Sequence, residues 1–180
     1  AMILAPTREL AFQIQETVDK FGRARKIFAT TLVGGADMHA QVRGLRQRPD
    51  ILVATPGRLL DHMWQGTVSF ANLQIVVLDE ADRMLDMGFA PQLNQIIEAL
   101  PEPRQTLLFS ATMPNNLADL ARMSLKDPFK ALVAKSATPA EGVTHTVHHT
   151  PNSDKTSLLL SLLKETQGSV LVFTRTKHRA

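Results

Sequence analysis

Residues 75–82 read IVVLDEAD, four apolar residues followed by a segment with three carboxylates, Asp79, Glu80 and Asp82. Carboxylates this close repel one another, so a cation has to offset their charge. An apolar strand that ends in Asp-Glu suits a site for hydrated Mg²⁺ beside a nucleoside triphosphate, in which the aspartate supports the ion and the glutamate orients water. The pattern therefore predicts Asp79 and Glu80 as Mg²⁺ ligands, partly through water. The alternative is a helix N-terminus, because its dipole favours acidic residues and residues 81–85 look helical.

Two other segments place a hydroxyl near a guanidinium, PTREL at residues 6–10 and TPGR at residues 55–58. Both groups donate hydrogen bonds to phosphate oxygens, so together the segments predict a track for a nucleic-acid backbone. Thr7 also suits a helix N-cap, with Glu9 as a favourable acid in the first turn. The two interpretations are compatible, because a helix N-terminus is itself an anion site.

Two short segments carry small or hydroxyl residues after apolar runs. Gly34 and Gly35 would let a nucleic-acid backbone approach closely, although by themselves they indicate a tight turn more readily. SAT at residues 110–112 contains no acid or base and cannot itself be catalytic. Its hydroxyls are expected to hydrogen-bond Asp82 or the residues beside it. The alternative is an ordinary Ser/Thr cap ahead of Pro114.

The other polar and aromatic residues favour ordinary interpretations. The six histidines show no metal-ligand spacing, and the adjacent pair at 148–149 would point to opposite faces of a strand. Core packing is expected for five residues, Trp64, Met84, Leu85, Met87 and Phe89. A solvated helix face is favoured over an RNA contact for three arginines, Arg43, Arg46 and Arg48.

Short apolar runs alternate with amphipathic stretches, the pattern of a parallel sheet with helices on both faces. The expected strands are 2–5, 27–33, 51–54, 75–78 and 106–109, and the expected helices are 8–21, 42–45, 57–64, 91–100 and 115–124. Ligands of such α/β sheets bind beyond the carboxyl ends of the strands. PTREL, TPGR, DEAD and SAT each follow a strand. All four should therefore meet at one edge of a doubly wound α/β sheet.

The pattern changes at residues 135–142 (KSATPAEG), a small, polar segment with a proline that is typical of a linker. It separates an expected first domain, residues 1–134, from the beginning of a second α/β unit, residues 143–180. In the second unit we expect strands at 143–149 and 169–174 and a helix at 153–165.

Composition narrows the class of protein. The 180 residues contain no cysteine, which excludes disulfides and thiolate metal sites and fits a reducing cytoplasm. No apolar run is long enough to cross a bilayer and no signal peptide is visible, so no membrane partner is expected. The formal net charge of +3 tolerates a polyanionic partner without requiring one.

Six segments occur in the order and at roughly the spacing of motifs in the DEAD-box RNA helicases of superfamily 2: APTREL, the Gly34-Gly35 pair, TPGR, VLDEAD, SAT and LVFTRTK. The chain resembles that family over essentially its whole length. MLDMGF and VFTRTKH look most like the bacterial RhlE-type branch. The resemblance implies two RecA-like lobes, ATP and Mg²⁺ as cofactors, and RNA gripped by its backbone with little sequence preference. It also implies ribosome-assembly or RNA-decay proteins as partners.

The resemblance also implies roles for individual residues. Asp79 and Glu80 would act on Mg²⁺ and water, while Asp82, Ser110 and Thr112 would link the states of the lobes; these five are the candidate catalytic residues. The RNA-binding candidates are Pro6, Thr7, Arg8, Gly34, Gly35, Thr55, Pro56, Gly57, Arg58, Thr174 and Arg175.

No G-x-x-x-x-G-K-[ST] phosphate-binding loop (P-loop) occurs in the sequence, and the adenine-reading Q motif and most of a second lobe are missing too. We therefore interpret the chain as a fragment cut at both ends, without a central portion of the first lobe's sheet. Alone, it is expected to hydrolyse very little ATP, and to be marginally stable or to pair through an exposed strand edge. Two alternative functions stay open, a DNA-directed helicase of the same superfamily and a non-catalytic RNA-binding remnant.

Overall fold

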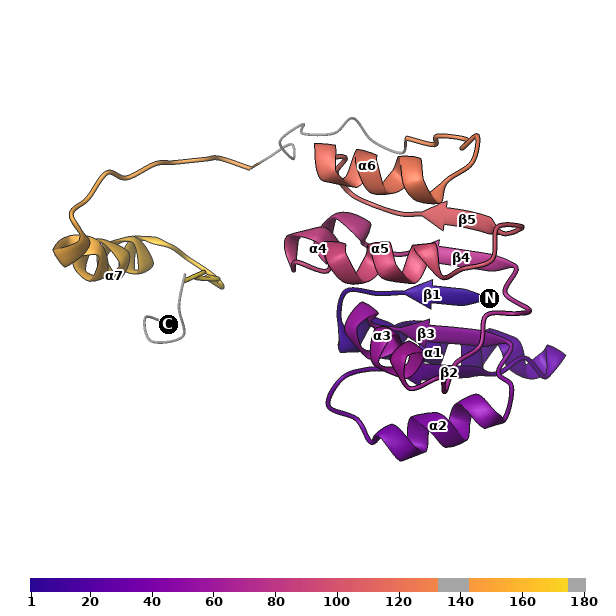
Figure 1. Cartoon of the computed structure of the whole chain (residues 1–180). Helices are drawn as coiled ribbons and strands as arrows, with labels where there is room; N and C mark the ends of the chain where they lie inside the picture. Colours follow the sequence, from indigo (N-terminus) through magenta and orange to yellow (C-terminus); the bar gives the residue numbers. More distant parts are fainter. Residues whose placement is uncertain (133–142, 175–180) are drawn as a thin grey trace. The chain divides into compact units, whose positions relative to one another are not determined.

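A computed structural model of the chain describes residues 1–132 and 143–174. The chain divides into two compact units, Ala1–Ser136 and Ala137–Ala180, and each is described by itself (Figure 1). The expected linker at 135–142 lies outside the described residues, and so does Arg175.

The first unit is built on a five-stranded parallel sheet. Its strands are β1 (Met2–Leu4), β2 (Ala29–Leu32), β3 (Ile51–Ala54), β4 (Ile75–Leu78) and β5 (Gln105–Leu108), in the spatial order β2-β3-β1-β4-β5. From the central β1 the chain moves to β2 at one edge, returns to β3, and then crosses to β4 and β5 on the other side (Figure 1). The predicted doubly wound parallel sheet is therefore confirmed. The five strands pair without a gap, although a missing central portion was expected.

Helices connect the strands at positions close to those that the apolar spacing predicts. They are α1 (Arg8–Gly22), α2 (Met38–Arg46), α3 (Pro56–Trp64), α4 (Ala81–Asp86), α5 (Ala90–Glu98) and α6 (Asn115–Ser124), with a 3-10 turn η1 (Arg23–Arg25) after α1. Pro56 occupies the first turn of α3, where its fixed φ suits the helix and its missing N–H removes no helical hydrogen bond.

The two faces of the sheet are covered unequally. On one face, α3, α4, α5 and α6 bury the larger core, in which Leu4 and Leu78 are fully inaccessible. On the other face, α1 places Leu10, Ile14 and Val18 on a small cluster over β2 and β3. The side chains that alternate toward that second face on β1, β4 and β5 are not fully buried: Ile3, Val77 and Leu107 are half-buried, and Ile75 and Gln105 are exposed.

Two residues that were expected in the core are exposed instead, because each lies where a helix ends. Trp64 is the last residue of α3 and is 71% exposed, and Met87 follows α4 and is 50% exposed. Met84 and Leu85 are buried and Phe89 packs against the larger core, as predicted.

The second unit contains a 3-10 turn η2 (Asn152–Asp154) and helix α7 (Lys155–Glu165), which confirms the predicted helix. The predicted strands at 143–149 and 169–174 are wrong, because neither segment is a strand in the described residues. Two short apolar segments and one helix do not form a sheet that is stable by itself. None of the helices in the described ranges is long and apolar enough to cross a membrane.

Candidate nucleotide and nucleic-acid site at the carboxyl edge

The four polar segments begin side by side at the carboxyl edge of the sheet. Backbone hydrogen bonds continue across the sheet just past the strand ends and join the starts of neighbouring segments. They run from Thr55 N to Leu32 O (3.0 Å), from Ala5 N to Ala54 O (2.9 Å), from Asp79 N to Leu4 O (3.0 Å) and from Phe109 N to Leu78 O (2.9 Å). The parallel sheet therefore sets the order TPGR, PTREL, DEAD, SAT along one edge.

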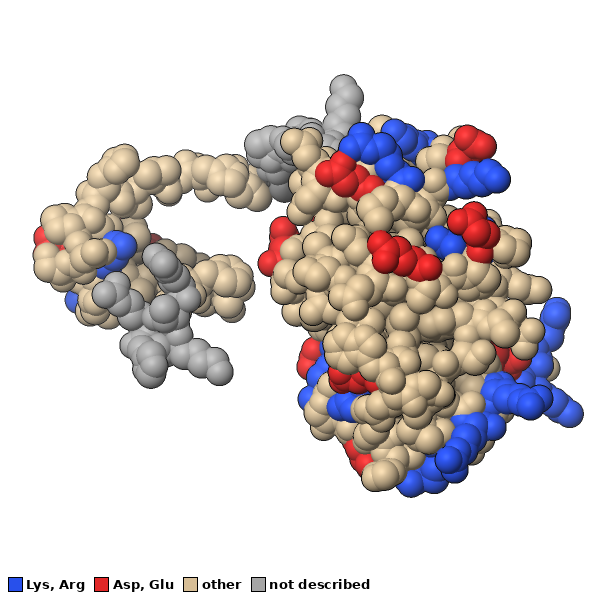
Figure 2. All heavy atoms as spheres, viewed as in Figure 1, with Lys and Arg blue, Asp and Glu red and all other residues tan. Residues whose placement is uncertain are grey.

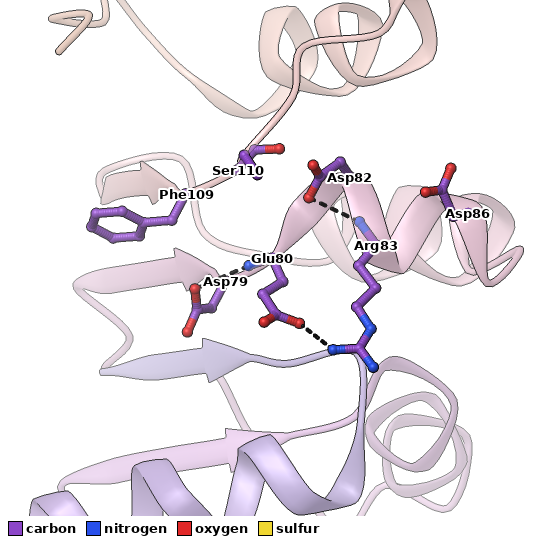
Figure 3. Close-up of a pocket in the computed structure, with 8 residues that line it drawn as sticks. Asp79, Glu80, Asp82, Arg83, Asp86, Phe109 and Ser110 are labelled. Atoms are coloured by element: carbon purple, nitrogen blue, oxygen red, sulfur yellow. Dashed lines mark hydrogen bonds and ion pairs between the residues drawn. The ribbon is translucent and has the colours of Figure 1, made fainter. Parts of the chain in front are cut away.

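The acidic residues line an open pocket of about 490 Å³ together with the start of the loop after β5 (Figure 3). The Asp79 carboxylate accepts a hydrogen bond from the Glu80 N–H at 3.0 Å. Glu80 lies in the left-handed region, with φ 47° and ψ 51°, between the end of β4 and the start of α4. A side chain with a Cβ is strained there, and such strain is characteristic of functional sites.

Arg83 is the basic residue that lines the acidic pocket. Its Nη1 lies 2.9 Å from Glu80 Oε2, and the two side chains are 56% and 41% exposed. Figure 3 marks this ion pair with a dashed line. A pair this exposed contributes at most about 1 kcal/mol of stability, because water competes for both groups. Arg83 was not among the predicted site residues, although it lies only three positions after Glu80, in α4.

Asp82 connects α4 to the SAT segment. Its Oδ2 accepts hydrogen bonds from the Thr112 hydroxyl at 2.7 Å and from the Thr112 N–H at 2.9 Å, and its Oδ1 accepts one from the Arg83 N–H. Burial acts to raise the pKa of Asp82, but hydrogen bonding from Thr112, from the Ser110 side chain and from the Arg83 N–H outweighs it and holds the pKa below its usual value. The expected contact between SAT and Asp82 is therefore present.

The Ser110 hydroxyl donates its proton to the Thr112 carbonyl oxygen at 2.6 Å, and the Ser110 side chain also lies close enough to Asp82 to help lower the pKa of that carboxylate. This bond closes the SAT turn. The alternative interpretation, a Ser/Thr cap for the following helix, is wrong: Pro114 is the N-cap residue of α6 and no side chain caps that helix.

PTREL and TPGR line a second open groove, of about 480 Å³. Seven of the nine RNA-binding candidates in the first unit line it, and Glu9, Asp61, Met87 and Phe89 complete the wall. Of the other two, Pro56 is buried in α3 and Gly35 lies against Arg8. Thr174 belongs to the second unit, and Arg175 lies outside the described residues.

Thr7 caps α1, because its hydroxyl oxygen accepts the Leu10 N–H at 3.2 Å. The cap uses a lone pair and leaves the hydroxyl proton free to be donated. Arg8 is exposed next to it, and its guanidinium lies against Gly35, where an added Cβ would come within 2.5 Å of Nη1. Gly35 has φ +72°, so glycine is favoured there for its backbone as well, whereas Gly34 faces open space.

The second threonine and arginine are used differently. Thr55 makes no cap hydrogen bond with its side chain, although it is the N-cap residue of α3. Arg58 is turned partly into the protein: Nη2 donates to the Ala36 carbonyl at 3.3 Å and Nη1 contacts Met38 Sδ at 3.5 Å. Arg58 thereby holds the loop that follows Gly35.

A buried polar network stabilises the same loop, and sequence analysis missed it. Gln41 donates to the carbonyls of Val33 at 3.1 Å and Ala36 at 3.3 Å, on either side of the glycine pair. Its Oε1 lies 3.3 Å from Nε2 of the fully buried His62, and His62 Nδ1 lies 2.7 Å from the Thr67 hydroxyl. Because Gln41 Oε1 only accepts, Nε2 carries a proton. Burial, with the nearby Arg58 charge, lowers the pKa of His62.

The donors of the acidic pocket fit Mg²⁺ in kind. Among the described residues no three Asp, Glu, His or Cys side chains gather closely enough to hold a metal by themselves. Mg²⁺ keeps several waters and binds through one or two carboxylates together with substrate phosphates. Two neighbouring carboxylates in an open pocket match that requirement, and a closed cage would not.

Residues 1–120 match the sequence model of the DEAD/DEAH box helicases. The ATP-dependent rRNA helicase RRP3 of Meyerozyma guilliermondii is 46% identical over 179 residues, which cover 98% of this chain and 38% of that protein. The DEAD-box ATP-dependent RNA helicase 30 of Arabidopsis thaliana is 43% identical over 180 residues, which cover 98% of this chain and 30% of that protein. The chain thus spans less than two fifths of the length of these relatives. They are eukaryotic and give no specific support to a bacterial RhlE-type branch.

Two solved structures resemble about 70% of the chain. A hypothetical ATP-dependent RNA helicase from Sulfolobus tokodaii matches 70% of this chain and 38% of its own, with a TM-score of 0.66 and 35% identity. The yeast DEAD-box splicing factor Prp28 matches 69% of this chain and 30% of its own, with a TM-score of 0.67 and 35% identity. These matches confirm the predicted RecA-like fold of the parallel sheet.

Proposed function

The chain belongs to the DEAD/DEAH box helicase family, and we propose that it provides part of an ATP-dependent RNA helicase that unwinds short RNA duplexes. The observation that supports this most directly is the adjacency of two surfaces. The acidic pocket after β4 and the hydroxyl–guanidinium groove after β1 and β3 open at one edge of one sheet. A nucleotide-dependent change in the first can therefore act on a polyanion in the second.

We propose Asp79 and Glu80 as the residues that support Mg²⁺ with bound ATP. When bound, the ion supplies positive charge to the phosphates and to the attacking water. Glu80 orients that water through its carboxylate. To do so it exchanges its present partner, Arg83, for the water, and the pair is exposed enough for this exchange to cost little.

Asp82 and the SAT segment are proposed to transmit the state of the acidic pocket. Asp82 is on α4, two residues after Glu80, and its two bonds to Thr112 tie α4 to the chain after β5. A shift of α4 when the pocket fills would move Thr112, or break these bonds. Ser110 takes part indirectly, because it closes the turn that presents Thr112.

RNA is proposed to lie in the groove between PTREL and TPGR, held by its backbone. Three donors there have no partner within the described protein: the Arg8 guanidinium, the Thr7 hydroxyl proton and the Thr55 hydroxyl. Arg58 Nε is unpaired as well, but it is buried. Donors of this kind read phosphates and carry no sequence information, so little sequence preference is expected. The names of the rRNA helicase relatives favour ribosomal RNA as the substrate and ribosome-assembly proteins as partners over RNA-decay proteins. Residues 143–180 would begin the second lobe, and Thr174 and Arg175 would face RNA.

The proposal is tested in the whole protein that carries this chain. Glu80→Gln should lower RNA-stimulated ATP hydrolysis at least about 100-fold, the usual contribution of a positioned base, while ATP still binds. Glu98→Gln, the same change on an exposed position of α5, should have no effect. Unchanged turnover in Glu80→Gln would remove this residue from the mechanism.

The choice of polymer decides between the remaining functions. Stimulation of ATP hydrolysis by RNA, and not by DNA of the same sequence, supports the proposal. Stimulation by DNA alone would indicate a DNA-directed helicase, and RNA binding without any hydrolysis in the unmodified protein would indicate a binding remnant.

A further inference from the structure

A basic surface lies at the amino edge of the sheet, opposite the site described above. α1 begins at the carboxyl edge, so its end and η1 lie at the amino edge, where β2 starts; α2 likewise ends just before β3 starts. We call this the amino-edge surface and define it by Lys20, Phe21, Arg23, Arg25 and Lys26 from the first segment and Arg43, Arg46 and Arg48 from the second. All eight residues are exposed. In Figure 2, Lys and Arg side chains gather at the lower right of the first unit, on the side of the strands' amino ends.

The two segments meet in space. Phe28 N donates to Asp50 Oδ2 at 3.2 Å, and Asp50 N donates to the Phe28 carbonyl at 3.1 Å. Lys26 and Arg48 each precede this contact by two residues. The cations from the end of α1 and from the end of α2 therefore form one surface, although the helices pack on opposite faces of the sheet.

Most of this charge is not neutralised by the protein. Lys20 pairs with Glu16 at 2.7 Å, and Arg43 lies 3.9 Å from Asp37. In the described part of the chain, no carboxylate lies within ion-pair distance of Arg23, Arg25, Lys26, Arg46 or Arg48. The whole chain has a net charge of only +3, so the excess at this edge is local.

Folding does not explain the choice of residues. Lys26 and Arg48 both have φ +55°, a conformation that glycine and asparagine adopt at lower cost. Phe21 is 80% exposed among the cations, and burying it would have been favourable. A lysine and an arginine in strained positions, on the same edge of the sheet as an exposed ring, are consistent with selection for a ligand.

We propose that the amino-edge surface binds single-stranded RNA, with its cations at the phosphates and Phe21 stacked on a base. Exposed aromatic rings within a basic surface are the usual means of holding single strands without sequence preference. A lipid surface fits less well, because an interfacial helix needs a free apolar face and that of α1 packs on the sheet. The surface is distinct from the proposed helicase groove, so it would hold a strand that flanks the duplex.

The test measures binding of a fluorescein-labelled oligouridylate of about 20 nucleotides, long enough to span a single-strand site, by fluorescence anisotropy over a range of salt concentrations. The first variant carries Arg23→Gln, Arg25→Gln and Lys26→Gln. The matched control carries Lys126→Gln, Lys130→Gln and Lys164→Gln, three exposed cations elsewhere with the same change in charge. The second variant is Phe21→Ala.

The triple variant should bind roughly 10- to 100-fold more weakly at low salt, and the slope of log affinity against log salt should become shallower by about 2, because three phosphate contacts are lost. Phe21→Ala should weaken binding about fivefold or more and leave the slope unchanged, because stacking releases no counterions. The control should behave like the unmodified chain.

Three results would overturn the inference. The first is a control triple variant that weakens RNA binding as much as the amino-edge triple variant does. The second is an unchanged RNA affinity in Phe21→Ala. The third is displacement of the RNA by a polyglutamate peptide at equal charge concentration. Because these measurements use no ATP and leave the carboxyl-edge residues intact, their failure would not bear on the proposed helicase function.

Discussion

The Asp82–Thr112 contact makes a quantitative prediction about stability. Hydrogen bonds to a charged group contribute about 1.5 to 3 kcal/mol when shielded from water. Thr112 is exposed and Asp82 is half-buried, so water competes for both groups. The contribution of this hydrogen bond should therefore fall below that range, to about 1 kcal/mol. Thr112→Val removes the 2.7 Å bond to Oδ2 and leaves the bond from the backbone N–H. We therefore expect this variant to lose about 1 kcal/mol of unfolding free energy at neutral pH.

The same loss should depend on pH in a defined direction. The pKa of Asp82 is lowered in the folded protein, so folding favours its ionised form. The stabilisation is complete above the pKa of an unfolded aspartate, about 3.9, and is lost as the pH falls through the lower folded value. The difference between the unmodified chain and Thr112→Val should be constant from neutral pH to about pH 5 and shrink below about pH 4.

A double-mutant cycle of Asp82→Asn and Thr112→Val isolates this interaction from other effects of each change. Urea unfolding is best followed by far-ultraviolet circular dichroism, because the single tryptophan, Trp64, is already 71% exposed in the folded state. The control cycle, Glu80→Gln with Arg83→Gln, should give a coupling of about 0.5 kcal/mol or less, since that pair is a surface ion pair. A coupling for Asp82 and Thr112 no larger than the control, or one unchanged in acid, would refute the reasoning.

Three further predictions concern the packing around the site. Gly35→Ala should cost about 1 kcal/mol, because φ is +72° and the Arg8 guanidinium must move, whereas Gly34→Ala, which meets open space, should cost almost nothing; urea unfolding compares them. The pKa of His62 is lowered in the folded chain, so the unmodified chain should lose stability relative to His62→Gln as the pH falls below about 6.5. The loss should be at most about 1.4 kcal/mol per pH unit. Parallel curves of stability against pH for the two proteins would contradict this. Leu59→Ala should cost about 2 to 5 kcal/mol because Leu59 is fully buried, and Trp64→Ala should change stability by less than about 0.5 kcal/mol because the ring is exposed; equal melting shifts would contradict the burial pattern.

Much of the first unit could be predicted because its signals are local. β3, β4 and α6 have the predicted bounds, since each carries a run or stripe of apolar residues that contributes to the core. The second unit shows the limit of such signals: residues 143–149 and 169–174 have strand-like composition, but a strand also needs neighbours to pair with. Trp64 shows another limit, because the sequence gives its hydrophobicity and not the position of the helix end relative to the sheet.

The meeting of the four segments at one edge could be predicted, whereas most of the contacts between side chains could not. Parallel strands bring their carboxyl ends to one edge, so the meeting of four segments follows from the strand pattern alone. The contacts of Gln41 and His62 join residues 21 positions apart on different helices. No local periodicity encodes such a pair, and only the packing of α2 beside α3 brings it together.

The two threonine–arginine segments show why residue type alone does not identify a phosphate contact. Thr7 uses its oxygen as a helix cap and Arg8 stays exposed, whereas Thr55 leaves its hydroxyl uncommitted and Arg58 binds the loop after Gly35. In each segment one member is used for structure and the other is available for a ligand. The available guanidinium belongs to PTREL and the available hydroxyl to TPGR, so the groove presents a charged donor at β1 and a neutral one at β3. A phosphodiester chain laid across them would therefore be held most strongly at Arg8 and positioned by Thr55, with Arg58 acting through the shape of the glycine loop.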